Sequence, residues 1–185
     1  MGSEKVPLPG RLIVGVLWNR TEDLEDAERR IREVFGPINR RSEPVPFGQY
    51  THYYEPEMGE ELCRCFWSFS SPFQRGSLVE AKLTTNRIER LTAKAGCRAV
   101  NLDPGLLTPE ALNLATTKPY YHRIYISKGI FGELALLYRK GSYEPLPWTY
   151  PDYCETWAIE FFQAVREEMM EKRKAGRGSK EERRR

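Results

Sequence analysis

The chain lacks the short motifs that identify the largest enzyme classes. It has no Gly-x-x-x-x-Gly-Lys-Ser/Thr phosphate loop, no Asn-Lys-x-Asp, no Gly-x-Ser-x-Gly elbow and no His-Glu-x-x-His. Histidine is also scarce, since only His52 and His122 are present. These absences weigh against P-loop NTPases, serine hydrolases and zinc proteases, and they leave two candidates for any mechanism that uses histidine.

Long apolar runs and cysteines are scarce too. The apolar run Leu12–Trp18 has seven residues, whereas a membrane-spanning helix needs about 20. No basic segment precedes this run and no small-residue cleavage site follows it, so we expect no signal peptide and no membrane insertion. The four cysteines, Cys63, Cys65, Cys97 and Cys154, lack the usual spacing of zinc ligands and fit reduced thiols in the cytoplasm.

Neither sign of charge dominates the body of the chain. The sequence has 29 Lys and Arg against 26 Asp and Glu, a net charge of +3. Residues 171–185 hold eight basic and three acidic groups, so the other 170 residues carry a net charge of −2. We therefore expect one globular domain over 1–170 and a basic, disordered tail over 171–185. This distribution disfavours nucleic acid as a partner, except for weak contact through the tail.

The order of the predicted elements favours an α+β fold. Periodicity of apolar residues predicts strands at 12–18, 62–70, 98–102, 122–127, 131–139 and 143–146, and helices at 21–35, 77–96, 108–114 and from Trp157 onward. The first part matches a ferredoxin-like split βαβ, an antiparallel-rich sheet with helices on one face. A β-meander and a C-terminal helix extend it. A three-layer α/β fold with a mainly parallel sheet is the alternative.

The segment around Asp103 contains the first candidate site. A strand that ends at Asp103-Pro104-Gly105, before a helix that begins at Thr108, would expose backbone N–H groups at a concave edge. Such a helix N-terminus binds phosphate or carboxylate, and Asn101 and Asp103 would contact the ligand or a bound cation. The alternative is an ordinary turn in which Asp103 accepts local backbone hydrogen bonds.

A basic cluster at one predicted strand is the second candidate. Arg123 is suited to bidentate binding of phosphate, while Lys118 and Lys128 add mobile positive charge. His122 is suited to act as an acid or base near neutral pH. The alternative pairs Arg123 with Glu133 on the next strand and buries His122 with one hydrogen bond.

The aromatic segment Trp148-Thr149-Tyr150-Pro151-Asp152-Tyr153 is the third candidate. Trp148 and Tyr150 offer flat faces on which a nucleobase can stack. The alternative is that these aromatic side chains cover the edge of the core.

Five segments together resemble a known family. They are Lys82-Leu83-Thr84-Thr85-Asn86, Val100-Asn101-Leu102-Asp103-Pro104-Gly105, Ala115-Thr116-Thr117-Lys118, His122-Arg123-Ile124-Tyr125 and Trp148-Thr149-Tyr150-Pro151-Asp152-Tyr153. In this order they resemble an uncharacterised bacterial family, domain of unknown function 4416, from about Gly10 to Arg166. Its members often carry the label GTP-binding protein, so the resemblance implies a guanine nucleotide as the ligand.

These patterns favour a domain that binds a nucleotide or another small phosphate-bearing anion. In this interpretation Arg123 and Lys128 hold phosphate, and Asp103 holds a ribose hydroxyl or a Mg²⁺ ion that accompanies the nucleotide. We predict no metal site beyond this one. One alternative is a non-enzymatic protein-interaction module with exposed aromatic surfaces. Another is a small enzyme for an anionic substrate, with His122 as acid and base and Asp103 or Glu55 as its partner.

Overall fold

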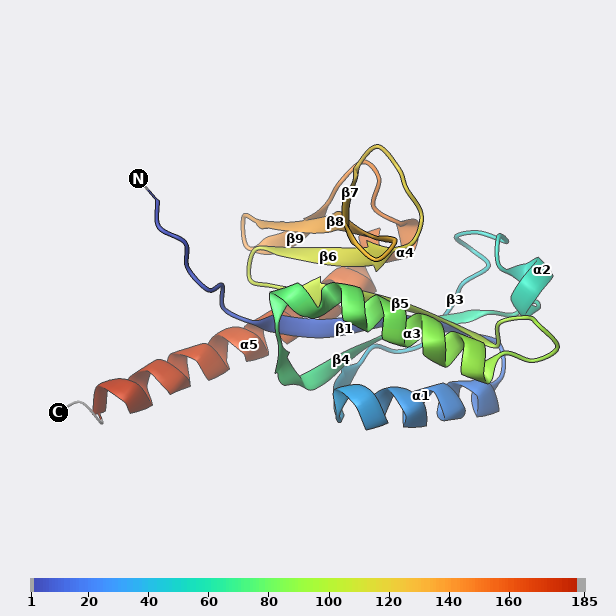
Figure 1. The fold of residues 1–185 in the computed structure, drawn as a ribbon, viewed down its shortest axis with the longest axis horizontal. Helices are drawn as coiled ribbons and strands as arrows, with labels where there is room; N and C mark the ends of the chain where they lie inside the picture. The colour runs from blue at the N-terminus through green and yellow to red at the C-terminus, as the bar shows by residue number, and fades with distance from the viewer. Residues whose placement is uncertain (1, 183–185) are drawn as a thin grey trace.

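The apolar stretch predicted as a buried strand is an interior strand of the nine-stranded sheet that the described residues form (Figure 1). The computed structural model describes residues 2–182. The strands are β1 (Gly10–Trp18), β2 (Ile38–Arg41), β3 (Val45–Pro46), β4 (Cys63–Phe73), β5 (Val100–Leu107), β6 (Ala111–Thr116), β7 (Arg123–Ser127), β8 (Ile130–Arg139) and β9 (Ser142–Pro145). The α-helices are α1 (Thr21–Phe35), α2 (Glu55–Met58), α3 (Leu78–Thr92), α4 (Pro151–Cys154) and α5 (Thr156–Glu182).

The strand order confirms the predicted α+β fold. The main path of the sheet runs β2-β4-β1-β5-β6-β8-β7, and every pairing is antiparallel. The first four strands of this path, with α1 and α3, have the order of a split βαβ unit. The strands β6 to β9 then extend the sheet as the predicted meander. The mainly parallel three-layer alternative is therefore wrong.

Alternate side chains of β1 enter two different cores, because successive residues of a strand point to opposite faces. Val14 and Val16 pack with Ile31 of α1 and with α3 on one face. Ile13 packs on the other face with Phe162 of α5. Thus α1 and α3 share one face, as predicted, and the C-terminal helix covers the opposite face (Figure 1).

The structure corrects the prediction for residues 98–114. β5 continues through Asp103 and Gly105 to Leu107, and residues 111–116 form the strand β6 rather than a helix. Pro104 is tolerated because it pairs with β1 on one side, while β6 pairs with β5 only from Gly105 onward. The segment Thr108–Glu110 is the hairpin turn, in which Thr108 N–H donates to the Ala111 carbonyl at 2.8 Å. The proposed anion site at a helix N-terminus is therefore absent from this segment.

The C-terminal helix reaches beyond the body of the domain (Figure 1). It runs to Glu182 and so enters the segment 171–185 that the sequence predicts to be a tail. Residues 183–185 lie outside the described residues, and the division into domain and tail stays a prediction. Among residues 2–182, no helix is long and apolar enough to cross a membrane.

Gly105 provides a test of the β5–β6 hairpin. A Cβ atom at this position would lie 2.8 Å from Cδ2 of Leu114 and 3.2 Å from the Asn113 carbonyl oxygen. Gly105→Ala should therefore lower the free energy of unfolding by about 1–3 kcal/mol, as overpacking does. Urea denaturation measures this loss. Gly76→Ala is the control, because a Cβ at Gly76 meets nothing within 4 Å; equal losses in both variants would contradict the close approach.

Candidate ligand-binding cavity

A cavity of about 890 Å³ opens where β5 and β6 diverge. The two strands pair only over Gly105–Leu107, and beyond Leu114 β6 pairs with β8 alone. Within the described chain this leaves one edge of β5 unpaired from Val100 to Pro104. Segments 47–54, 114–123 and 148–153 supply most of the walls, and α3 closes one side.

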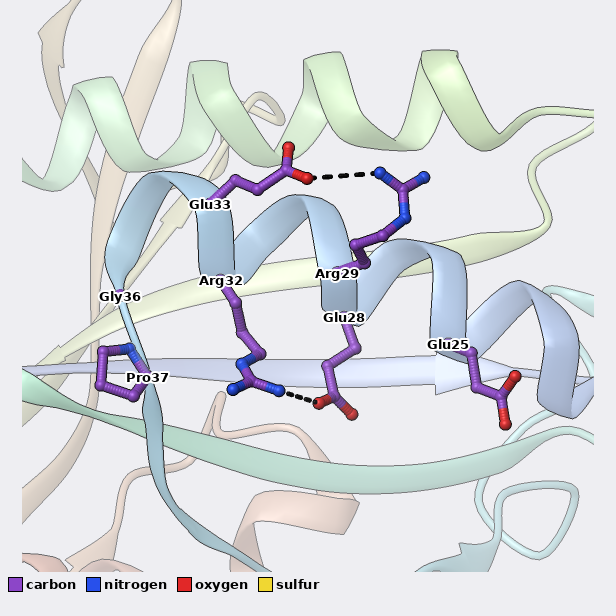
Figure 2. Close-up of a pocket in the computed structure, with 7 residues that line it drawn as sticks. All are labelled: Glu25, Glu28, Arg29, Arg32, Glu33, Gly36 and Pro37. Carbon is purple, nitrogen blue, oxygen red and sulfur yellow. Dashed lines mark hydrogen bonds and ion pairs between the residues drawn. The ribbon is translucent and has the colours of Figure 1, made fainter.

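A shallower hollow of about 560 Å³ on the outer face of α1 lacks the features of a ligand site (Figure 2). Four of its charged side chains form pairs, Arg29 with Glu33 and Arg32 with Glu28, each at 3.3 Å. Such pairs, four residues apart on one helix, stabilise it by only about 0.2–0.5 kcal/mol. The cavity between β5 and β6 is therefore the candidate site.

The floor of the cavity is built around Arg64, a buried cation near the start of β4. Its side chain is 5% exposed; Nε donates to Oδ2 of Asp152 at 2.8 Å, and Nη1 lies 3.5 Å from Oδ2 of Asp103. The guanidinium also lies over the rings of Phe66 and Tyr153, 5.3 Å from each centroid. Since an unpaired buried charge costs several kcal/mol, the two carboxylates keep Arg64 in this position.

Gly15 leaves room for the buried guanidinium. A Cβ at Gly15 would lie 2.7 Å from the hydroxyl oxygen of Tyr153 and 2.9 Å from Nη2 of Arg64. Either contact is shorter than side chains tolerate, so β1 needs glycine at this position. In the described part of the chain the buried Tyr153 hydroxyl has no hydrogen-bond partner.

Asp103 is the accessible carboxylate of the floor. Asn101 Nδ2 donates to its Oδ2 at 2.6 Å, and Lys82 Nζ lies 3.4 Å from its Oδ1. Asp103 nevertheless exposes 31% of its side chain. Burial would raise the pKa of Asp103, but Lys82 and Arg64 outweigh this effect and hold the pKa below its usual value. The carboxylate is therefore ionised at neutral pH.

Arg98 forms hydrogen bonds both with α2 and with a residue of the cavity floor. Its Nε and Nη2 donate to the two carboxylate oxygens of Glu57 at 2.8 and 2.6 Å, a bidentate pair. Its Nη1 donates to Oδ1 of Asn101 at 2.7 Å. Nearby, Glu89 accepts a hydrogen bond from the Leu102 N–H at 2.7 Å, and burial raises the pKa of Glu89. The floor and the 50–60 segment are thus joined by one polar network.

The opposite wall contains a second buried ion pair. Arg123 Nε donates to Oε2 of Glu133 at 2.6 Å, and the two side chains are 4% and 1% exposed. His122 Nε2 lies 3.3 Å from the same oxygen, and the His122 ring stacks on Trp148 at 5.1 Å. This is the alternative arrangement raised for Arg123 and His122, and it is the one that the structure contains.

The other nitrogens of Arg123 form hydrogen bonds with residues at the mouth of the cavity. Nη1 donates to the Lys118 carbonyl at 3.0 Å, and Nη2 donates to the Tyr150 hydroxyl at 2.8 Å. Lys118 Nζ lies over the ring of Tyr53, 4.8 Å from its centroid. Tyr53 and Tyr150 are both exposed, so aromatic faces and an ammonium group border the entrance.

Cations outnumber carboxylates on the lining. The cations are Arg64, Lys82, Arg90, Arg98, Lys118 and Arg123, and the carboxylates are Glu89, Asp103, Glu133 and Asp152. In the part of the chain that the structure describes, Arg90 and Lys118 form no salt bridge, whereas the other four cations do. The unneutralised positive charge is therefore on these two residues.

The cavity brings together most of the residues singled out from the sequence. Asn101, Asp103, Lys118, His122, Arg123, Trp148 and Tyr150 all line it. Lys128 does not: its exposed ammonium pairs with Glu80 of α3. The convergence depends on the β5–β6 hairpin and not on the helix expected after Asp103.

The buried charged residues of the cavity floor were not predicted from the sequence. Arg64 interrupts the apolar strand β4, and Lys82 and Glu89 share the buried face of α3 with Leu78 and Thr85. A charged residue at an apolar position of a strand or helix was the available signal, since such residues are rarely buried without a partner. Their partners come from distant segments and could not be read from spacing.

The polar clusters do not form an evident metal site. Within residues 2–182, no group of three or more His, Cys, Asp or Glu side chains is arranged to hold a metal ion. The four cysteines are free thiols, and burial raises the pKa of Cys65 to about 12, so that this thiol stays protonated.

Comparison with known proteins places the chain in a family. The sequence profile described as Domain of unknown function (DUF4416) matches residues 8–169. The chain belongs to this family. No curated protein and no solved structure gives a significant match. Every residue that lines the cavity lies within the segment that defines the DUF4416 domain.

Arg64 is expected to be essential for the stability of this DUF4416 domain. Arg64→Met would leave Asp103 and Asp152 without their shared cation and should cost about 3–5 kcal/mol of unfolding free energy. Arg41→Met is the control, because Arg41 pairs with Glu28 on the surface and should cost at most about 1 kcal/mol. Denaturation of both variants in guanidinium chloride compares them, and similar losses would refute a central role of Arg64.

Asp103 should give the domain a defined acid sensitivity. Because its folded pKa is lowered, its charge stabilises the fold above the unfolded pKa of about 3.9, and this contribution is lost as pH falls through the folded pKa. Asp103→Asn should therefore be less stable than the wild type at neutral pH, and the difference should shrink only as the pH falls below the unfolded pKa of about 3.9 and through the lower folded pKa. Unfolding curves across this range measure it; a difference independent of pH would contradict the assignment.

Proposed function

We propose that the cavity binds a small phosphate-bearing anion of nucleotide size. The observation that carries this proposal is a cavity of about 890 Å³ whose cations outnumber its carboxylates and whose mouth is aromatic. Its volume lies within the usual range of small-molecule sites, about 300–1,000 Å³. The predicted guanine nucleotide fits this description, although the chain would hold it with side chains rather than with a phosphate loop.

Lys118 and Arg90 are the proposed phosphate-binding groups. Both line the cavity and neither forms a salt bridge within the described residues, so each can pair with a phosphate without first losing a carboxylate. Arg123 was expected to hold phosphate directly. Because each of its nitrogens already has a partner, we assign it the positioning of Lys118 and Tyr150.

Asp103 and the aromatic residues would bind the rest of the ligand. An ionised, accessible carboxylate accepts hydrogen bonds from ribose-type hydroxyls, and it can contact a Mg²⁺ ion that enters with a nucleotide. Tyr53, Tyr150 and Trp148 offer faces for a base. Since Cys97 and Cys154 are exposed free thiols, we place this activity in the reducing cytoplasm.

The two alternative functions have less support. The aromatic segments around Tyr53 and Tyr150 border a cavity, whereas an interaction module would present them as one outer surface. For an enzyme, His122 would have to leave Glu133, and the lowered pKa of Asp103 makes it a weak base near neutral pH.

Thermal unfolding with GTP, GDP and ATP, each with and without Mg²⁺, tests the proposal. A ligand that binds only the folded state raises the melting temperature with its concentration. Lys118→Gln should weaken that ligand roughly tenfold, a loss of about 1.4 kcal/mol. Lys128→Gln is the matched control, because Lys128 lies outside the cavity and should bind as the wild type does. No stabilisation at millimolar nucleotide would refute a nucleotide ligand.

A further inference from the structure

The strand β7 presents an apolar patch to solvent at the end of the sheet. The β7 patch consists of Ile124, Tyr125 and Ile126 of β7 and of Tyr120 and Tyr121 just before it, all between 47% and 89% exposed; Tyr120 also lines the cavity. They fall within seven consecutive residues, although exposed apolar side chains are usually scattered singly over a soluble domain. Ile124 and Ile126 share one face of β7 and Tyr125 lies on the other, so exposed apolar side chains flank this edge strand on both faces. Such a cluster marks a contact surface.

β7 also has an unpaired edge. It is the terminal strand of the sheet and, among the described strands, pairs only with β8. The strand at the opposite end of the sheet is β2. Its Arg40 and Arg41 form ion pairs with Glu168 and Glu28, and these charges disfavour pairing of that edge with another strand. In β7 the residues Ile124, Tyr125 and Ile126 carry no charge.

We propose that the β7 patch is the interface of a homodimer in which β7 pairs with β7 of a second copy. A two-fold axis through Tyr125 would place this residue opposite itself, because antiparallel pairing of a strand with its own copy is symmetric. Ile124 then faces Ile126 of the second copy, and Arg123 faces Ser127, so no like charges meet. The strand sequence is thus complementary to itself.

The area of the patch fits this partner. From side-chain areas of about 150–250 Å² for aromatics, the five exposed residues present roughly 600 Å², close to the ~800 Å² that each partner of a standard interface buries. The register of β7 against β8 shifts between Tyr125 and Ser127, which bends the strand and keeps the new pairing short. The side chains therefore contribute more of the stabilisation than the backbone.

Sedimentation equilibrium of the full chain tests the dimer. The wild type should have twice the 21.6 kDa mass of one chain at micromolar concentration. Tyr125→Lys should be monomeric, because it places two ammonium groups opposite each other. Val34→Lys is the control, since Val34 is a similarly exposed apolar residue on α1 and should remain dimeric. A monomeric wild type, or a dimeric Tyr125→Lys, would overturn the proposal.

Disulfide trapping tests the register independently of any loss of stability. Residues directly opposite in an antiparallel pair have Cα atoms about 4.5–5.5 Å apart, within disulfide range. With Cys97 and Cys154 replaced by serine, Tyr125→Cys should form a covalent dimer under mild oxidation, while Val34→Cys should not. Absence of the Tyr125 cross-link in a dimeric protein would place the interface elsewhere and overturn the β7 pairing.

Discussion

The buried charge of Arg64 is the constraint on which the cavity depends. A guanidinium inside an apolar strand is stable only with carboxylates beside it, and here these come from Asp103 on β5 and Asp152 in α4. The same group requires glycine at position 15 of β1. One side chain therefore joins three distant parts of the chain and fixes the position of the cavity floor.

The second constraint is the divergence of two strands. β6 leaves β5 after three residue pairs and follows β8, so Lys82 can pass the unpaired edge of β5 and reach Asp103 from the other side of the sheet. A sheet that remained paired along β5 would have filled this space with backbone hydrogen bonds. The cavity is thus a consequence of the strand topology. It is polar because charged side chains such as Lys82 reach into the gap beside β5.

The contacts of Arg123 and His122 differ from those that their residue types suggest. Arginine is suited to bind phosphate and histidine to transfer protons, yet Arg123 and His122 both contact the Glu133 carboxylate, and the His122 ring stacks on Trp148. Their contribution to the proposed site is the placement of the mouth. Lys118, which has the same charge but no carboxylate partner in the described chain, retains the capacity to bind an anion.

The split βαβ unit, the meander and the C-terminal helix could be predicted from the sequence, because apolar periodicity and turn residues act locally. Of the residues that line the cavity, the sequence pointed to only a minority, those whose residue types suggest binding. The helix predicted for 108–114 was wrong: Thr108-Pro109 begins a hairpin turn. The reason is that the Leu112 and Leu114 side chains are buried in the core of the sheet, which favours a strand. Which charges neutralise each other depends on the folded arrangement of distant segments. Pairing of Arg64 with Asp152, or of Lys82 with Asp103, joins residues distant in sequence, and no local pattern specifies it.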